Sequence, residues 1–190
     1  MTTYVQNFLK FQPLLKELIA RDIKVKYRKS VLGVLWTLLN PLFMMIVLSV
    51  VFSNLFKFDV EYFPVYLLSG QLIFNFYSEV TTCSMSAIID NGPLIKKVYV
   101  PKYLYPLSSV LFNYVIFLIS LIVLAMVSVI LGVKPTFYLL QAPIALILIL
   151  IMSYGCGMIL ATIGVFFRDM EYLWSVALML VMYTCAIFYY

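Results

Sequence analysis

Three polar residues with regular spacing interrupt an otherwise apolar stretch, residues 63–88. Gln71, Asn75 and Glu79 are four residues apart and therefore share one face of a helix. A charged side chain in the middle of a membrane span costs at least ~2.5 kcal/mol on insertion scales, so this face should point into a bundle or toward water. Two interpretations stay open: the wall of a substrate conduit or intersubunit contact, and a hydrogen-bonded pair between neighbouring helices.

The side chains that most often support catalysis or metal binding are absent or isolated. The sequence has no histidine, and the spacing of Cys83, Cys156 and Cys185 matches no metal site. No glycine precedes a lysine, which excludes the common phosphate-binding loop of nucleotide hydrolases. The sequence therefore predicts no catalytic residue, no metal site and no cofactor bound by this chain. An intramembrane enzyme that uses Glu79 on polyprenyl-phosphate sugars is a minor alternative.

The elements that carry these residues must be membrane helices. The chain is 65% hydrophobic and 11% charged, whereas ordinary soluble domains contain about 25% charged residues. Its apolar runs approach or exceed the ~20 residues that a helix needs to cross a bilayer. We expect an all-α, polytopic membrane protein with one transmembrane domain, residues 1–190. The predicted spans are residues 31–55, 64–88, 106–131, 139–166 and 172–190.

Lysines and arginines are distributed unevenly among the predicted loops. Eleven of the 13 precede the first span or fall in the second and fourth loops, and only Lys57 and Lys134 fall in the others. The positive-inside rule therefore places the N-terminus in the cytoplasm. We attribute the net charge of +5 to membrane lipid headgroups and predict no nucleic-acid partner. Residues 1–30 are expected to be cytoplasmic or interfacial, with an amphipathic helix from Pro13 to about Lys29.

Three features predict how the spans pack. Pro41 lies inside the first span and leaves the carbonyl of Thr37 without its usual partner. The fourth span carries a stripe of small residues that allows close helix approach: Ser153, Gly157, Ala161 and Gly164. The third span is rich in leucine, isoleucine and valine, from which we expect an outer helix that faces lipid.

A short basic loop, residues 89–105, separates the second and third spans. Asp90 or Asn91 can cap a short helix that starts at Pro93, and Pro101 ends it before the next span. Position and charge alone favour an ordinary cytoplasmic loop. A docking surface for a cytosolic ATPase is the alternative, because this chain lacks the commonest nucleotide-binding loop and Glu79 is its only mid-span carboxylate.

Several ordered groups of residues across nearly the whole chain resemble one family of permeases. They are residues 21–33, Trp36, residues 39–42, Leu68-Ser69-Gly70, Asn75-Phe76, Asn91 with residues 94–99 and Pro101, and Phe167-Arg168-Asp169. The family is the ABC-2 type permeases for polysaccharide and polyol-phosphate export, with a type V exporter-like membrane domain. Its members continue beyond the fifth span with short re-entrant helices and a sixth span, which this sequence does not contain.

The resemblance implies a homodimeric permease in the bacterial cytoplasmic membrane, bound to two copies of a separate ATPase subunit that uses ATP and Mg²⁺. It implies a lipid-linked or phosphate-containing glycan as substrate: O-antigen, capsule or teichoic acid. The implied coupling residues are Asn91, Gly92, Pro93, Leu94, Ile95, Lys96, Lys97, Val98 and Tyr99, with Arg168 and Asp169 as a smaller contact. The aromatic residues expected to face the conduit are Trp36, Phe43, Tyr183 and Phe188, because the resemblance places spans one and five at the dimer interface. The alternatives are a permease for a small lipid, drug or peptide, and a non-catalytic assembly partner.

Overall fold

The structure, a computed structural model, describes residues 2–28, 32–33, 35–55, 62–97, 99–133 and 137–185. Within these ranges the chain forms helices and no strand. The helices are α1 (Thr2–Tyr27), α2 (Leu35–Leu55), α3 (Phe63–Asp90), α4 (Gly92–Ile95), α5 (Leu104–Ile130), the 3-10 helix η1 (Phe137–Gln141), α6 (Ala142–Phe166) and α7 (Met170–Thr184). The all-α fold class predicted from the sequence is confirmed.

Local sequence sets where several helices begin and end. A proline lies in the first turn of α3, α4 and α6, where its missing N–H costs no hydrogen bond. Helix α5 ends at Ile130, and Gly132 follows its C-cap with a φ of +72° that suits glycine. The Gly132 N–H donates to the Val129 carbonyl (3.1 Å) and the Val133 N–H to that of Ser128 (3.0 Å). This is a Schellman motif, which satisfies two carbonyls at the helix end.

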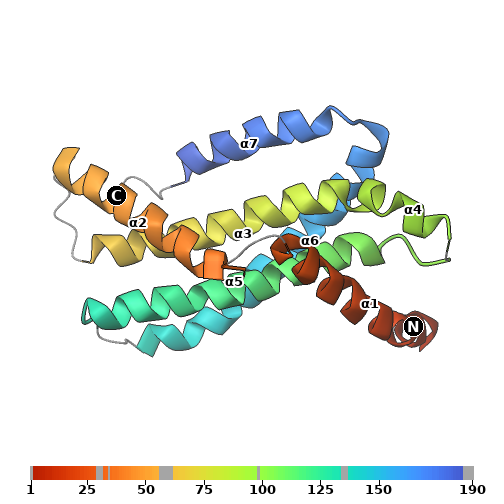
Figure 1. Ribbon diagram of the computed structural model, residues 1–190, viewed down its shortest axis with the longest axis horizontal. Coiled ribbons are helices and arrows are strands. Elements are labelled where there is room, and N and C mark those ends of the chain that lie inside the picture. Colours follow the sequence, from red (N-terminus) through yellow and green to blue (C-terminus); the bar gives the residue numbers. More distant parts are fainter. Residues whose placement is uncertain are drawn as a thin grey trace.

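Helix α3 is the element against which most of the others pack. It contacts α2, α5, α6 and α7, and it leads at its end directly into α4 (Figure 1). Its 28 residues span about 42 Å at 1.5 Å per residue, more than the ~30 Å hydrocarbon core of a bilayer. The main core between α3 and α5 consists of eight buried apolar residues: Leu68, Leu72, Phe76, Val80, Val110, Phe117, Val123 and Val127.

The expectation that the third span is an outer, lipid-facing helix is wrong. Helix α5 contacts α1, α2, α3 and α6 and carries buried residues along its length. Small and polar side chains on its buried face, Ser108, Asn113 and Ser120, permit this packing. Aliphatic residues suit both lipid and a helix bundle, so the composition of the span did not distinguish the two positions.

The stripe of small residues on α6 allows close helix approach, as the sequence predicts, and the helix that approaches it is α3. Ser153, Gly157, Ala161 and Gly164 are all buried. A Cβ atom added at Gly157 would lie 2.8 Å from the Ser84 Oγ, and one at Gly164 would lie 2.9 Å from the carbonyl oxygen of Met85. A side chain at Gly164 would therefore meet the backbone of α3, and one at Gly157 would meet the Ser84 side chain.

Helix α2 continues through Pro41. The Thr37 carbonyl, which Pro41 cannot bond, receives a contact from α5: the Ser120 Oγ lies 3.3 Å from it. The same hydroxyl lies 3.0 Å from the Ile116 carbonyl of its own helix. A hydroxyl on a neighbouring helix thus replaces the missing backbone donor, a solution typical of proline in membrane helices.

Helix α1 begins at Thr2 rather than at the predicted Pro13, which lies inside it. Its apolar side includes Leu15 and Leu18, 5% and 3% exposed, which pack on a small core with Ala87, Val100, Leu104 and Tyr105. This helix is therefore attached to the ends of α3 and α5. Helix α7 is joined to α3 by a hydrogen bond from the Trp174 indole N–H to the Thr81 hydroxyl (3.0 Å).

Among the described residues, two helical segments have the length and hydropathy of membrane spans, Leu104–Ile130 and Leu139–Phe166. The apolar segments Leu35–Val51 and Met170–Thr184 are shorter, and α3 carries the polar face described above. The five-span division of the chain stays a prediction.

We predict that replacing Gly164 with alanine destabilises the bundle, whereas the same change at Gly155 does not. The new Cβ at Gly164 would meet backbone of α3, and relieving such overpacking costs about 1–3 kcal/mol. Gly155, on the same helix, has open space within 4 Å, so alanine there should be neutral or stabilising by up to ~1 kcal/mol. Thermal unfolding of both variants in detergent measures the difference. Equal midpoints would contradict the close α3–α6 contact.

Candidate functional site

A cavity of about 520 Å³ lies where α1, α2, α3 and α5 meet. The polar face predicted on the second span, Gln71, Asn75 and Glu79, lines it. Trp36 of α2 lines it too, and 48% of its side chain is exposed. The structure thus brings together four of the residues for which the sequence predicts a conduit role.

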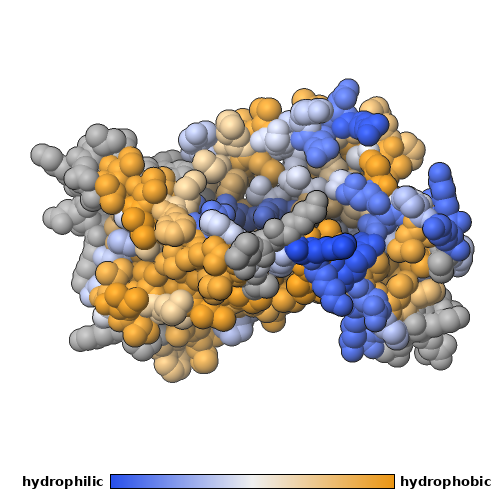
Figure 2. All heavy atoms as spheres, viewed as in Figure 1, coloured by the Kyte–Doolittle hydropathy of each residue, from blue (hydrophilic) through white to orange (hydrophobic). Residues whose placement is uncertain are grey.

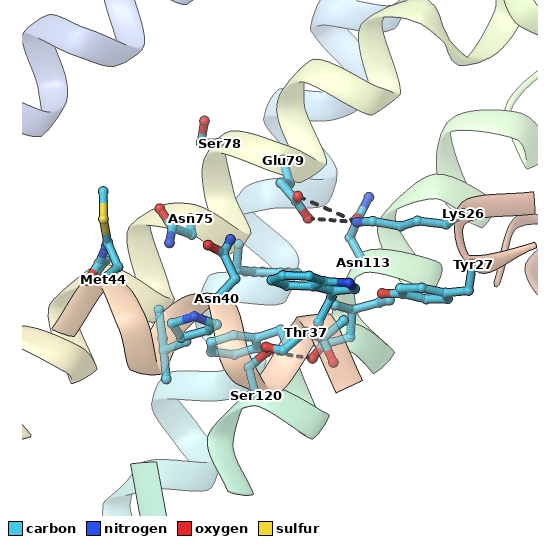
Figure 3. A pocket seen from close by; sticks show the side chains of 17 residues that line it. Lys26, Tyr27, Thr37, Asn40, Met44, Asn75, Ser78, Glu79, Asn113 and Ser120 are labelled. Carbon is cyan, nitrogen blue, oxygen red and sulfur yellow. Dashed lines mark hydrogen bonds and ion pairs between the residues drawn. The ribbon is translucent and has the colours of Figure 1, made fainter. Parts of the chain in front are cut away.

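Glu79 forms an ion pair with Lys26, near the end of α1. The Lys26 Nζ lies 3.3 Å from Oε2 and 3.5 Å from Oε1 of Glu79 (Figure 3). The same ammonium lies 5.4 Å from the centre of the Phe112 ring on α5, within the range of a cation–π contact. Lys26 of α1 is therefore the partner of Glu79. Its side chain contacts both α3 and α5.

Further polar residues of the cavity come from α1, α2 and α5. They include Tyr27, Asn40 and Asn113, and all three are labelled in Figure 3. The Asn113 amide nitrogen donates to the Ser109 carbonyl (2.9 Å), which fixes the side chain. Burial, and secondarily the Glu79 carboxylate, raise the pKa of the Tyr27 phenol above its ordinary value, so this group stays a neutral hydrogen-bonding partner.

Sequence reasoning missed Lys26, Asn40 and Asn113 as cavity residues. Asn40 is four residues after Trp36, a signal that could have placed both on one face of a helix. For Lys26 and Asn113 the sequence carries no comparable signal, because their neighbours in the cavity are distant in sequence.

Two of the predicted conduit residues lie away from the cavity. Phe43 is 53% exposed on α2, and Tyr183 is 64% exposed on α7. Phe188 lies outside the described residues. The conduit role of these three residues stays a prediction.

The basic loop between α3 and α5 contains a short helix, α4, one residue earlier than predicted. Asn91 precedes it, but its side chain does not cap it, contrary to expectation. The Asn91 amide nitrogen instead donates to the Ala87 carbonyl (2.8 Å) and so satisfies the end of α3. The Asn91 carbonyl oxygen accepts from the N–H groups of Leu94 and Ile95, both at 3.0 Å, which closes the turn of α4.

The side chains of this loop divide into two groups. Leu94 and Ile95 are half-buried against the small core formed with α1 and α5. Lys96 and Lys97 are exposed, and Tyr99 is 93% exposed. Val98 lies outside the described residues. The loop is thus anchored by aliphatic residues and presents two ammonium groups and an aromatic ring outward.

Arg168 and Asp169 are both exposed in the turn between α6 and α7. This turn and α4 lie toward the same end of the molecule, as does the start of α1 (Figure 1). Hydrophilic residues collect at this end on the face shown in Figure 2, whereas the coloured residues toward the opposite end are mostly hydrophobic. The two segments predicted to contact an ATPase therefore share one polar end of the bundle.

Comparison with known proteins identifies the class of protein that this bundle represents. The family described as ABC-2 type transporter matches residues 13–190, and the chain belongs to it. It is therefore related to the membrane subunits of transporters rather than to enzymes.

Individual relatives have more specific descriptions. The chain is 30% identical to an O-antigen export system permease protein RfbA of Klebsiella pneumoniae, over 93% of this chain and 68% of the relative. It is 31% identical to the protein of that name from Myxococcus xanthus, over 100% of this chain and 73% of the relative. A polysialic acid transport protein KpsM of Escherichia coli is 27% identical, over 81% of this chain and 61% of the relative.

We predict that reversing either charge of the Lys26–Glu79 pair destabilises the protein and that exchanging both restores it. Lys26→Glu places two carboxylates together, and Glu79→Lys places two ammonium groups together, whereas the double variant re-forms the pair. Because both side chains are partly exposed, the coupling should be small, about 0.5 kcal/mol. A double-mutant cycle on thermal unfolding measures it.

Lys24→Glu provides the matched control, since it reverses an exposed charge on the same helix. Its effect should be independent of the residue at position 79. Strictly additive effects of Lys26→Glu and Glu79→Lys would show that the pair does not hold α1 to α3.

Proposed function

We propose that this chain is the membrane-spanning permease of an ATP-driven exporter, which moves a polysaccharide across the bacterial cytoplasmic membrane. The observation that carries the proposal is the match to O-antigen export permeases over 93–100% of the chain. The polysialic acid transport protein among the relatives supports a glycan substrate as well. A lipid-linked or phosphate-containing glycan such as O-antigen, capsule or teichoic acid is the proposed cargo.

The conduit in this proposal includes the cavity between α1, α2, α3 and α5. Its lining supports the role, because it combines amide groups with an exposed indole. In the homodimer that we propose, Phe43, Tyr183 and Phe188 complete the conduit. Exposed apolar side chains on α2 and α7 are available for contact with a second copy: Ile46, Val47, Val50, Val176, Met179 and Leu180.

Deleting the gene in its native host tests this function. We predict that the surface glycan is lost while its lipid-linked form accumulates inside the cell, because synthesis continues without export. Immunoblotting of intact and lysed cells separates the two pools. An unchanged surface glycan together with increased sensitivity to a drug or peptide would instead favour a permease for a small lipid, drug or peptide.

Energy for transport must come from another chain in this proposal. A cytosolic ATPase that uses ATP and Mg²⁺ is the proposed partner, in two copies per permease dimer, with residues 91–99 as its main docking segment. Three features of the segment support this: its exposed lysines, the almost fully exposed Tyr99, and the anchoring of Leu94 and Ile95. Exposed aromatic residues often dominate the binding energy of an interface. Arg168 and Asp169 form the smaller second contact.

The docking segment is tested by reversing its outward charges. We predict that Lys96→Glu combined with Lys97→Glu weakens association with the ATPase roughly tenfold, equivalent to ~1.4 kcal/mol. These side chains point outward, so the fold should be unaffected. Replacing Leu94 is a poorer test, because Leu94 also packs on the core shared with α1 and α5. Affinity purification with quantification of the bound ATPase measures the change.

Lys24→Glu again serves as the control, because it changes charge on α1 and leaves the docking segment intact. It should retain the ATPase. Full retention of the ATPase by the Lys96→Glu, Lys97→Glu variant would exclude this segment as the main docking site.

A further inference from the structure

The cavity between α1, α2, α3 and α5 is polar but carries no net formal charge. Lys26 and Glu79 are its only charged lining residues within the described part of the chain, and they are paired at 3.3 Å. The remaining polar lining includes four amides and four hydroxyl groups. Asn40, Gln71, Asn75 and Asn113 come from three different helices. An amide side chain both donates and accepts hydrogen bonds, as a ligand rich in hydroxyl groups requires.

Three polar atoms of this lining are buried without a hydrogen-bond partner. They are the Tyr27 Oη, the Gln71 Oε1 and the Asn113 Oδ1. Asn113 is 2% exposed, and its amide nitrogen is already engaged with the Ser109 carbonyl. A buried acceptor without a donor costs about 1–3 kcal/mol. These three atoms have almost no accessible surface, so the amides of the lining that a ligand can reach are the exposed Asn40 and Asn75.

Trp36 supplies a flat apolar surface beside these amides. Of the tryptophan and phenylalanine side chains that line the cavity, Phe76 and Phe117 are 4% and 3% exposed, whereas Trp36 is 48% exposed. A tryptophan with an exposed face can pack against the C–H face of a sugar ring while neighbouring amides bond its hydroxyls. The cavity volume of about 520 Å³ falls within the 300–1,000 Å³ typical of small-molecule sites.

The charges of the cavity disfavour a phosphate group. Lys26 already has a carboxylate partner, and an anion approaching it would also approach Glu79. No other lysine or arginine lines the cavity in the described ranges. We propose that this cavity binds uncharged sugar units of the exported glycan rather than its phosphate groups. This inference rests on the proposed function and specifies which part of the cargo the site contacts.

Fluorescence of Trp36 provides a direct test. The sequence has two tryptophans, so Trp174→Phe leaves Trp36 as the only reporter. The full chain in lipid nanodiscs is titrated with a mannose disaccharide, a galactose disaccharide and glycerol 3-phosphate. At least one neutral disaccharide should produce a saturable change, and glycerol 3-phosphate should produce none. Saturable binding of glycerol 3-phosphate alone would overturn the proposal, and so would the absence of any saturable change.

Two amide variants locate the binding. Asn75→Leu should raise the half-saturating sugar concentration by about fivefold, the loss expected for one hydrogen bond. Asn75 is exposed on α3, so its replacement should not prevent folding. Gln141→Leu removes an exposed amide outside the cavity and should leave binding within about twofold of the parent. An equal change in the half-saturating sugar concentration in both variants would show that the sugar binds outside this cavity.

The sugar-binding test and the gene deletion can fail independently of each other. Loss of surface glycan on deletion, combined with no sugar binding in nanodiscs, would overturn the sugar site and leave the export function standing. Unchanged surface glycan on deletion would overturn the export function whatever Trp36 reports.

Discussion

The structure depends on two opposite faces of α3. One face must approach α6 closely, which Gly157 and Gly164 allow by placing no side chain between the two backbones. The other face carries Gln71, Asn75 and Glu79, whose polar groups cannot be left toward lipid. Close packing on the first face holds α3 in one rotation about its axis. The polar face is therefore directed into the space between α1, α2 and α5, where the cavity forms.

Three polar contacts between helices complete this arrangement. Ser120 of α5 lies 3.3 Å from the Thr37 carbonyl of α2, Trp174 of α7 bonds Thr81 of α3, and Lys26 of α1 pairs with Glu79. Two of these contacts engage buried hydroxyl groups, those of Ser120 and Thr81, which are costly to leave without a partner, whereas the Lys26–Glu79 pair is partly exposed. Because aliphatic packing between helices gains little over packing against lipid, these contacts and the close glycine packing specify which helices are neighbours.

The sequence predicted the features that arise within one helix and missed those that depend on two. The four-residue spacing of the polar face, the stripe ending at Gly164 and the carbonyl freed by Pro41 follow from helical geometry alone, and the structure contains all three. The central position of α5 could not be derived from its aliphatic content. Its buried Asn113 and Ser120 were the available signal. The pairing of Lys26 with Glu79 joins residues 53 positions apart, which no periodicity encodes.

Helix α3 also runs from the cavity to the basic loop. From Glu79 to Asp90 it continues as an uninterrupted α-helix, about 16 Å at 1.5 Å per residue, and Asn91 leads it into α4. The basic loop and the polar face of α3 are thus joined by continuous helix up to Asp90 and by the turn at Asn91. Helix α1 packs near α4 through Leu15 and Leu18 and also holds Glu79 through Lys26. Helix α1 thus contacts both the core beneath the docking segment and the cavity, which Lys26 and Tyr27 line, so in the proposed exporter a displacement of α1 changes the shape of the cavity.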